Sequence, residues 1–366
     1  MPVHPAPVLS MTKKTDTLKA EAIELLKELI TLPSFSKDEW QTASALSRYL
    51  AVKGVASSRI GNNVFATNYY YDSSKPTLLL NSHHDTVKPN AQYTNDPFQP
   101  IIADGKLYGL GSNDAGGALV SLLACFLYFH SNENLNYNLL FAATAEEEIS
   151  GTGGIESILP HLPSIDCAIV GEPTLMNLAI AERGLLVIDA VAHGRAGHAA
   201  REEGENAIYK ALKDIDRIRS YAFPKVSEVL GPVKISVTVI ETENKAHNQV
   251  PETCRFVIDV RVNELYTLEE VFQELQRHLT SKLTARSFRL RSSAIEMTHP
   301  LVKAGLALGK LPYGSPTTSD KALLPFPALK MGPGDSARSH AADEYIYLAE
   351  VEEGIDLYIQ LLNQLL

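Results

Sequence analysis

Cysteine is scarce in this chain of 366 residues, which contains Cys125, Cys167 and Cys254 and no others. The count is odd, the spacings are wide, and each cysteine lies in or beside an apolar stretch. A disulfide framework is therefore not expected, and buried free thiols in a reducing compartment are the better interpretation. Because no two cysteines form a C-x-x-C pair, a zinc site built from thiolates is not expected either.

Basic clusters and long apolar runs are missing as well. The formal net charge is −10 and no basic run is longer than Lys13-Lys14. Nucleic acid is therefore not an expected partner, because its phosphates require a basic surface. No ~18 apolar residues follow one another, so no membrane span is expected. Residues 1–12 do not resemble a signal peptide, and we predict that they form a disordered arm on a cytoplasmic protein.

What the chain does contain is a series of short apolar runs of strand type. They lie at Thr77–Asn81, Tyr137–Ala143 and Cys167–Gly171, and none alternates with polar residues. Such strands are buried on both faces, as in a mostly parallel sheet covered by helices. An apolar helix at Gly116–Phe129 lies between two of them, which gives the order of an α/β fold.

A different pattern begins near Gly184. Apolar and mostly polar residues alternate at Val233–Val239 and Phe256–Val262, which predicts strands with one buried face. Together with helices expected at residues 205–220 and 267–283, the order is strand, helix, strand, strand, helix, strand, as in a ferredoxin-like α+β sandwich.

The length also favours two domains, since one domain typically has ~100–200 residues. From about Thr298 the pattern returns to α/β and ends in a helix at Leu348–Leu365. We therefore predict a small domain at residues 184–292, inserted into a larger one made of residues 13–183 and 293–366.

Potential metal ligands follow each of the buried strands. His83 and Asp85 follow the first strand, Glu146-Glu147-Glu148 the second, and Glu172 the third. Asp114 precedes the apolar helix, and His340 comes after another apolar stretch. Because open α/β sheets bind ligands beyond the carboxyl ends of their strands, we expect these side chains at one edge.

Histidine mixed with carboxylates suits Zn, Co or Mn. Two histidines and three carboxylates exceed the needs of one tetrahedral ion, so two ions sharing a carboxylate are the economical arrangement. Each residue alone has an ordinary alternative: Asp114 could cap a helix, and the three glutamates could form a solvated turn.

In six stretches the sequence resembles the M20 family of metallopeptidases and amidohydrolases. The likeness extends over about Leu18–Leu365, and the motifs are most specific when taken together in this order. They are Ser82-His83-His84-Asp85-Thr86-Val87, Gly109-Leu110-Gly111-Ser112-Asn113-Asp114-Ala115-Gly116-Gly117, Thr144-Ala145-Glu146-Glu147-Glu148, Gly171-Glu172-Pro173-Thr174, Gly194-Arg195-Ala196-Gly197-His198 and Ser339-His340-Ala341-Ala342-Asp343-Glu344.

The resemblance implies a zinc-peptidase type of catalytic domain that holds two divalent ions, zinc before cobalt or manganese. Asp114 would bridge the two ions. His83 and Glu172 would complete one site, and Glu148 and His340 the other.

The same resemblance implies the catalytic groups. Asp85 would orient the His83 imidazole, as carboxylates behind metal-binding histidines do. Glu147 would be the general base, taking a proton from a water that bridges the ions and passing it to the leaving amine.

The inserted domain would act as a lid and as the dimerisation domain of a homodimer. There His198 would reach the active site of the other subunit and stabilise the oxyanion. Asn248 and Arg261 would bind a substrate carboxylate, a task suited to the planar guanidinium. The ordinary alternatives are a histidine in a polar turn and an arginine on a surface strand.

The substrate is expected to be a small N-acyl amino acid. The loops Gly314–Asp320 and Gly332–Ser336 resemble the acetylornithine deacetylase group, which implies removal of an acetyl or succinyl group from ornithine or citrulline in arginine biosynthesis. Competing activities are succinyl-diaminopimelate desuccinylase, aminoacylase and small carboxypeptidase. Leu110 and Ala115-Gly116 depart from the usual Arg and Met-Lys around the bridging aspartate, which leaves the subfamily open.

Two further classes would not be enzymes. One is a homologue that binds metal without turnover, and the other is a structural dimer. The presence of all five ligands, Asp85 and Glu147 argues for the enzyme.

Successive side chains at an extended strand end point to opposite sides, so His84 should face away from the metal that His83 binds. We predict that His83→Ala loses metal and activity and that His84→Ala loses much less of both. Metal content and turnover of the two purified variants check this; equal losses in both would contradict it.

Overall fold

The computed structural model describes residues 8–201 and 203–366 and divides them into two compact units. The first unit contains the chain up to Ile180 together with Ile295–Tyr313 and Ser319–Leu366; the second contains Ala181–Ala294 and Gly314–Thr318. The boundaries predicted at residues 184 and 292 fall close to these, and Gly314–Thr318 was not expected in the second unit. Of the predicted arm, residues 1–7 lie outside the described residues, and helix α1 spans Val8–Ile30.

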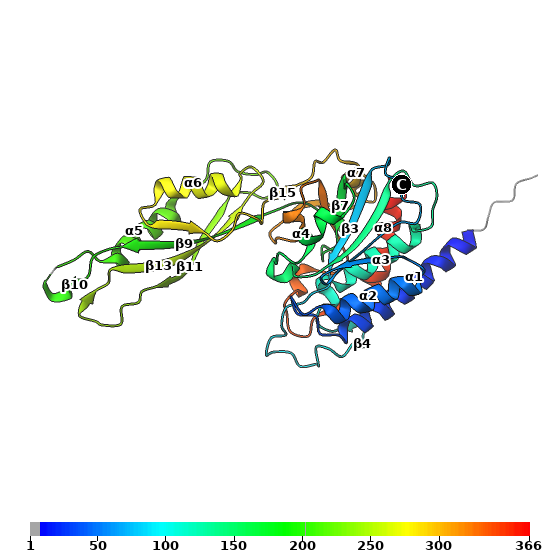
Figure 1. Cartoon of the computed structure of the whole chain (residues 1–366), viewed down its shortest axis with the longest axis horizontal. Helices are drawn as coiled ribbons and strands as arrows, with labels where there is room; N and C mark the ends of the chain where they lie inside the picture. Colours follow the sequence, from blue (N-terminus) through cyan, green and yellow to red (C-terminus); the bar gives the residue numbers. More distant parts are fainter. Residues whose placement is uncertain (1–7, 202) are drawn as a thin grey trace, which may run out of the picture. The chain divides into compact units, whose positions relative to one another are not determined.

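The first unit is built on a sheet whose central strands are parallel, drawn in Figure 1. Within the described residues this sheet has nine strands in the order β1-β2-β6-β3-β7-β17-β8-β15, and β16 also pairs with β8. The strands β6, β3, β7 and β17 are mutually parallel. The bounds are β1 Ser58–Ile60, β2 Asn63–Thr67, β3 Thr77–His83, β6 Asn138–Thr144, β7 Cys167–Val170, β8 Leu178–Glu182, β15 Ser293–Ala294, β16 Pro312–Ser315 and β17 Ala328–Lys330.

Helices bury both faces of the central strands. Leu78 and Leu80 of β3 belong to the core formed with the helices of one face, whereas Leu79 packs with α4 on the other. This is why the strand sequences are apolar without alternation. The helices are α2 Trp40–Val52, α3 Gly117–Phe129, α4 Ile155–Ile158, α7 Pro300–Ala307 and α8 Leu348–Leu362.

The most apolar helical stretch, Ser112–Phe129, is long enough to span a membrane, but 78% of it is buried inside the protein. It is the central core helix, in contact with α1, α8 and β3. The three cysteines are free and buried, as predicted. Burial raises the pKa of the Cys167 thiol to about 12.

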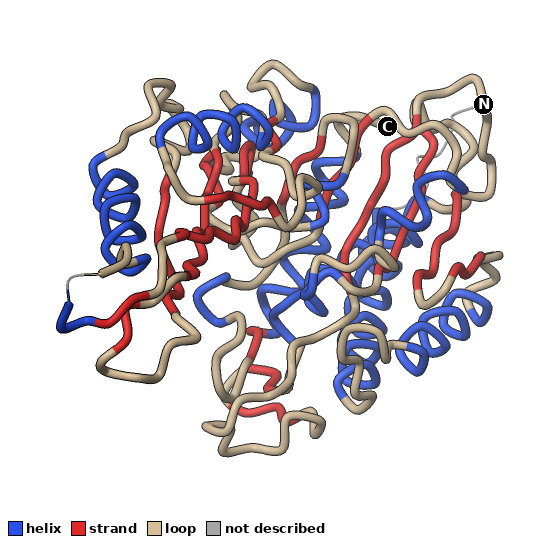
Figure 2. Tube along the Cα trace, turned by 60° about the vertical axis from the view of Figure 1, so that its left-hand side comes forward, coloured by secondary structure: helices blue, strands red, loops and turns tan. Residues whose placement is uncertain are grey.

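In its described residues, the second unit is built on a four-stranded antiparallel sheet with the helices α5 and α6 (Figures 1 and 2). The strand order β11-β13-β9-β14 is that of the ferredoxin-like fold, which confirms the predicted class. One face of the sheet packs on the helices α5 and α6. Along β9, the buried residues of this face alternate with more exposed residues of the opposite face. The bounds are β9 Gly184–His193, α5 Ala207–Ser220, β11 Lys234–Glu241, β13 Thr253–Val262, α6 Leu268–His278 and β14 Lys282–Ala285.

The helix predicted at residues 267–283 ends earlier than expected, at His278. The following turn is held by the buried carboxylate of Asp214, which accepts hydrogen bonds from the backbone N–H groups of Thr280 (3.0 Å) and Ser281 (2.7 Å). Leu283 then enters strand β14. The prediction was wrong here because a distant side chain, and not the local periodicity, ends the helix.

Two small sheets were not predicted. One pairs β10 (Gly197–His198) with β12 (Gln249–Val250). The other has the order β18-β5-β4, with bounds Tyr345–Tyr347, Lys106–Tyr108 and Ile101–Ala103. Strands of two or three residues are too short to show a period of two in the sequence.

Candidate metal centre

The carboxyl ends of three adjacent parallel strands place the candidate ligands together. His83 is the last residue of β3 and pairs with Thr144 at the end of β6. Glu147 and Glu148 follow β6 in the short helix η2 (Glu147–Ile149), and Glu172 comes two residues after β7. Because β3 lies between β6 and β7, all three ends meet at one edge, as the sequence predicts.

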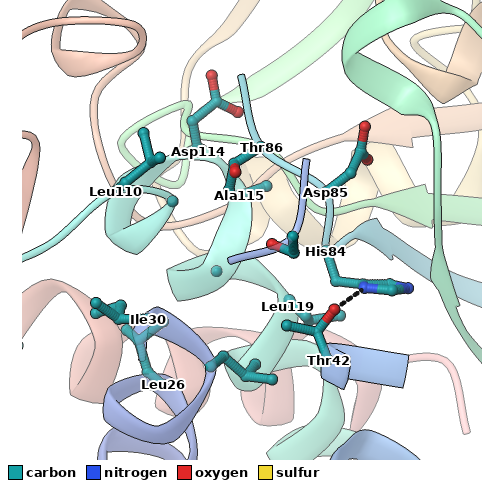
Figure 3. A pocket seen from close by; sticks show the side chains of 14 residues that line it. Leu26, Ile30, Thr42, His84, Asp85, Thr86, Leu110, Asp114, Ala115 and Leu119 are labelled. Atoms are coloured by element: carbon teal, nitrogen blue, oxygen red, sulfur yellow. Dashed lines mark hydrogen bonds between the residues drawn. The ribbon is translucent and has the colours of Figure 1, made fainter. Parts of the chain in front are cut away.

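His83 and His84 point in opposite directions, which confirms the predicted alternation. His84 is buried, and its Nδ1 lies 2.8 Å from the Thr42 hydroxyl (Figure 3). Its Nε2 lies 2.9 Å from the Asn62 carbonyl oxygen. Burial lowers the pKa of His84 to about 4, so the ring is neutral at pH 7. It lines a cavity of about 20 Å³, room for roughly one water molecule.

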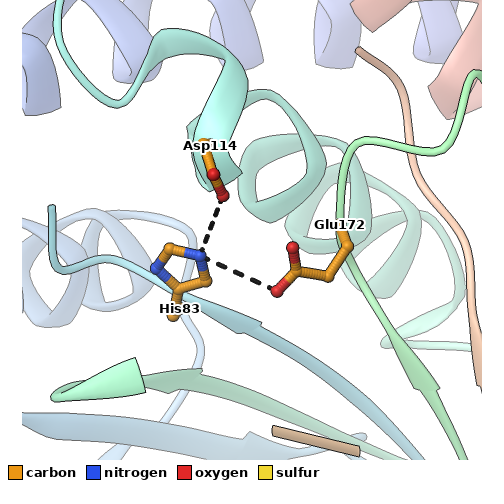
Figure 4. Close-up of side chains that lie close together, drawn as sticks. All are labelled: His83, Asp114 and Glu172. Atoms are coloured by element: carbon orange, nitrogen blue, oxygen red, sulfur yellow. Dashed lines mark hydrogen bonds and ion pairs between the residues drawn. The ribbon is translucent and has the colours of Figure 1, made fainter. Parts of the chain in front are cut away.

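His83, Asp114 and Glu172 form the first group of candidate ligands (Figure 4). His83 Nε2 lies 3.3 Å from Asp114 Oδ1 and 3.8 Å from Glu172 Oε1. The His83 side chain is 1% exposed, so the imidazole is fixed from all sides. The three residues come from β3, from the short helix η1 (Ser112–Gly116) and from the loop after β7.

Asp114, Glu148 and His340 form the second group. His340 Nε2 lies 3.0 Å from Glu148 Oε2 and 3.7 Å from Asp114 Oδ2. Asp114 thus directs Oδ1 to the first histidine and Oδ2 to the second. One carboxylate is shared by both groups, which is the arrangement that the sequence predicts for two ions.

The geometry and charge of both groups fit two divalent ions. Ligand atoms bound to one tetrahedral zinc at ~2.0–2.2 Å lie roughly 3.3–3.6 Å apart, close to the distances seen here. Burial, with the charges of Asp114 and Glu148, raises the pKa of Glu172 to about 8. Such clustered buried carboxylates need compensating positive charge to stay ionised, and two divalent cations would supply it.

Glu147 stands beside the two groups without belonging to either. Its Oε2 lies 4.0 Å from His83 Nε2. Burial raises the pKa of Glu147 well above its usual value, and the neighbouring Glu172 raises it further. A carboxylate next to the ligands whose side chain is only 14% exposed, with increased proton affinity, can act as a base.

Asp85, which was predicted to orient the His83 imidazole, also holds the backbone of a neighbouring turn. His83 Nδ1 lies 3.0 Å from the Asp85 main-chain oxygen and 3.4 Å from its carboxylate. The carboxylate accepts hydrogen bonds from the Ser36 hydroxyl at 2.7 Å and from the backbone N–H groups of Glu147 and Glu148, both at 3.1 Å. Asp85 therefore connects the strand end that carries His83 to the turn that carries the two glutamates.

Glu146, the first of the three glutamates, is part of the scaffold of this turn. It has a positive φ of 55°, and its carboxylate accepts a hydrogen bond from Gly153 N at 3.2 Å. A Cβ atom at Gly151 or Gly153 would collide with this side chain. The solvated-turn alternative therefore does not hold: Glu146 braces the turn, and Glu147 and Glu148 face the site.

Two buried acids near the site, Asp320 and Glu344, have no role predicted from the sequence. Asp320 accepts hydrogen bonds from Thr144 Oγ1 at 2.7 Å and from Asn81 Nδ2 at 3.1 Å. Glu344 accepts hydrogen bonds from three backbone N–H groups of the Asp114 loop. Both acids lie within motifs of the sequence, but their contacts are with segments far away along the chain.

The other three predicted site residues lie in the second unit. His198 is exposed in β10, and Ala199 N donates to the Asn248 carbonyl oxygen at 3.0 Å. Arg261 forms an ion pair with Asp259 on its own strand, with Nε 2.8 Å from Oδ1. The catalytic and binding roles of these residues stay predictions.

Comparison with known proteins agrees with this centre. The chain matches the family described as "Peptidase family M20/M25/M40" over residues 79–364. A succinyl-diaminopimelate desuccinylase of Cereibacter sphaeroides is 25% identical, covering 94% of this chain and 98% of that protein. One from Wolbachia pipientis subsp. Culex pipiens is also 25% identical, covering 75% of this chain and 73% of that protein.

Solved structures share the fold. An M20 family metallo-carboxypeptidase from Sulfolobus solfataricus has a TM-score of 0.74 at 18% identity, covering 94% of this chain and 99% of that one. A dinuclear metal binding peptidase of the M20 family from Bacillus subtilis has a TM-score of 0.73 at 15% identity, covering 95% and 98%. With the family match over most of its length, the chain belongs to peptidase family M20/M25/M40, a family of metal-dependent amidohydrolases and peptidases.

Proposed function

We propose that this protein removes the succinyl group from an N-succinyl amino acid of the diaminopimelate type. The observation that carries the hydrolytic part of the proposal is the Asp114 carboxylate shared by two ligand groups, with Glu147 beside them. The choice of substrate is supported by the relatives named succinyl-diaminopimelate desuccinylase, which include one aligned over nearly its whole length.

This choice differs from the main expectation of the sequence analysis, which was deacetylation of ornithine or citrulline in arginine biosynthesis. The loops Gly314–Asp320 and Gly332–Ser336 suggested that subgroup, but the curated relatives carry the name of its competitor. Both groups share the metal motifs, so the ligands themselves do not distinguish the two substrates.

Each group of the site has its own role in the proposed amide hydrolysis. Two divalent ions bound by the ligand groups would polarise the scissile carbonyl and the attacking water. Glu147 takes the proton of that water and hands it to the amine nitrogen as the carbon–nitrogen bond breaks, so that a neutral amine leaves. Asp85 keeps Glu147 in place through its hydrogen bond to the Glu147 N–H.

His198 is proposed to donate a hydrogen bond to the oxyanion in the active site of a second copy of the chain. Ala200 N donates to His198 Nδ1 at 3.2 Å, so Nδ1 is the acceptor and Nε2 carries the proton. An exposed ring with a protonated Nε2 is suited to this task. Asn248 and Arg261 are proposed to bind the carboxylate of the substrate, as the family resemblance implies.

Substrate choice is tested with the purified protein loaded with Zn²⁺, Co²⁺ or Mn²⁺. The panel is N-succinyl-diaminopimelate, N-succinylornithine, N-acetylornithine and N-acetylcitrulline. We expect the highest kcat/KM for N-succinyl-diaminopimelate. A higher value for either acetylated substrate, or no turnover of any of the four with any metal, would contradict the proposal.

Two neighbouring glutamates provide a matched test of the general base. Glu147→Gln should lower kcat by at least ~10²-fold, because the amide cannot accept the proton, and should leave the metal content unchanged. Glu148→Gln should instead weaken metal binding in the His340 group. The metal content of both variants and their kcat decide this; a Glu147→Gln protein with near-normal turnover would refute the assignment.

A further inference from the structure

We propose that Glu344 is a positioning residue. It fixes the Asp114 loop (residues 109–114) to the His340 loop (residues 335–344) and so places the shared Asp114 carboxylate between the two ligand groups. This inference rests on the proposed two-metal site. It assigns the residue an action through Asp114 and no contact with the substrate.

The Glu344 carboxylate accepts hydrogen bonds from the backbone of the Asp114 loop. It accepts hydrogen bonds from Gly111 N at 3.0 Å, Asn113 N at 2.8 Å and Asp114 N at 2.9 Å. The residue is only 2% exposed, so water is not available to replace these bonds. Three N–H groups, including that of the candidate metal ligand Asp114, therefore depend on the Glu344 carboxylate as their acceptor.

These N–H groups lie in the turn that begins η1 and precedes helix α3. In the described part of the chain, neither η1 nor α3 has a side-chain cap from its own flanking residue. The backbone is non-helical at Asp114 (φ −120°, ψ 96°) and Ala115 (φ −117°, ψ 28°), so these N–H groups need an acceptor from another segment. Glu344 supplies, from 230 positions away, the acceptor that the local sequence lacks.

The same contact anchors the segment that carries His340. The Glu344 main-chain oxygen accepts a hydrogen bond from Gly109 N at 3.0 Å, so both ends of the residue bind the Asp114 loop. A second cross-link is made by Asn113, whose side chain donates to the Asp335 carbonyl oxygen and accepts from Asp335 N, both at 3.0 Å.

The outer side of the His340 segment is also held. The Asp343 carboxylate accepts hydrogen bonds from Thr94 N and Asn95 N, both at 2.9 Å. His340 and Asp343 have φ values of 59° and 51°, a conformation that non-glycine residues adopt only when their surroundings hold them. The His340 loop is therefore held from both sides, and Glu344 connects it to the backbone of Asp114.

This arrangement predicts a specific pattern of metal binding. Because Asp114 belongs to both ligand groups, a shift of its loop should weaken both sites together, and not only one. Glu344→Gln keeps the size of the side chain but turns one acceptor oxygen into a donor that faces a backbone N–H. Glu344→Asp keeps the carboxyl group and withdraws it by one methylene.

The test is a Co²⁺ titration of the full-length wild type and both variants, followed by visible absorption. We expect two bound equivalents in the wild type and, in the variants, affinities at both sites lower by ~10–100-fold with an altered cobalt spectrum. With the preferred substrate, kcat should fall while KM changes little. Asp214→Asn is the control, because that buried carboxylate also accepts backbone N–H groups but lies in the second unit.

A purely structural role would lower the melting temperature of the Glu344 variants, as in Asp214→Asn, without changing the cobalt spectrum or either affinity. That result would overturn the inference, as would weakening of one site alone. Metal binding is measured without turnover, so a wild type that binds two ions and hydrolyses none of the substrates would refute the proposed function and leave this inference standing.

Discussion

The centre depends on one carboxylate that serves two ligand groups. Asp114 directs one oxygen to His83 and the other to His340, and without it the remaining ligands would form two separate and incomplete sets. The surrounding structure explains how a buried acid can stay in this place. Its backbone N–H donates a hydrogen bond to Glu344. Its carboxylate lies between the imidazoles of His83 and His340, which can bind the same metal ions as the carboxylate.

The rest of the site is arranged around this carboxylate by sheet geometry and by two further acids. Parallel strands bring His83, the two glutamates and Glu172 to one edge. Asp85 then connects the first of these strand ends to the second through the N–H groups of Glu147 and Glu148. The acids near the centre thus have different tasks: some are candidate ligands, one is a candidate base, and Asp85 and Glu344 hold backbone.

Much of this could be predicted because the relevant signals are local. Apolar runs without alternation identified β3, β6 and β7, and the residues directly after them had to meet at one edge. The opposite directions of His83 and His84 follow from strand geometry alone. The ferredoxin-like order of the second unit could be predicted because apolar and polar residues alternate at Val233–Val239 and Phe256–Val262.

What could not be predicted depends on contacts between distant segments. Glu344 accepts hydrogen bonds from the backbone of Gly111–Asp114, and Asp214 holds the turn after α6; neither contact leaves a periodicity in the sequence. The Asp85 carboxylate was expected to serve the imidazole, whereas its hydrogen bonds go mainly to backbone N–H groups and Ser36. Side-chain to backbone contacts of this kind become visible only when the chain is folded.

The central claim is that Asp114 is shared by two ions, and equilibrium Zn²⁺ binding to Asp114→Asn and Glu172→Gln tests it most directly. Glu172 belongs to one ligand group, so its variant should lose affinity at one site and retain the other. The Asp114 variant should lose affinity at both sites, because the amide nitrogen cannot act as a ligand at one site and the neutral amide oxygen is a weaker ligand than a carboxylate oxygen at the other. An Asp114→Asn protein that keeps one site with the affinity of the wild type would contradict the account.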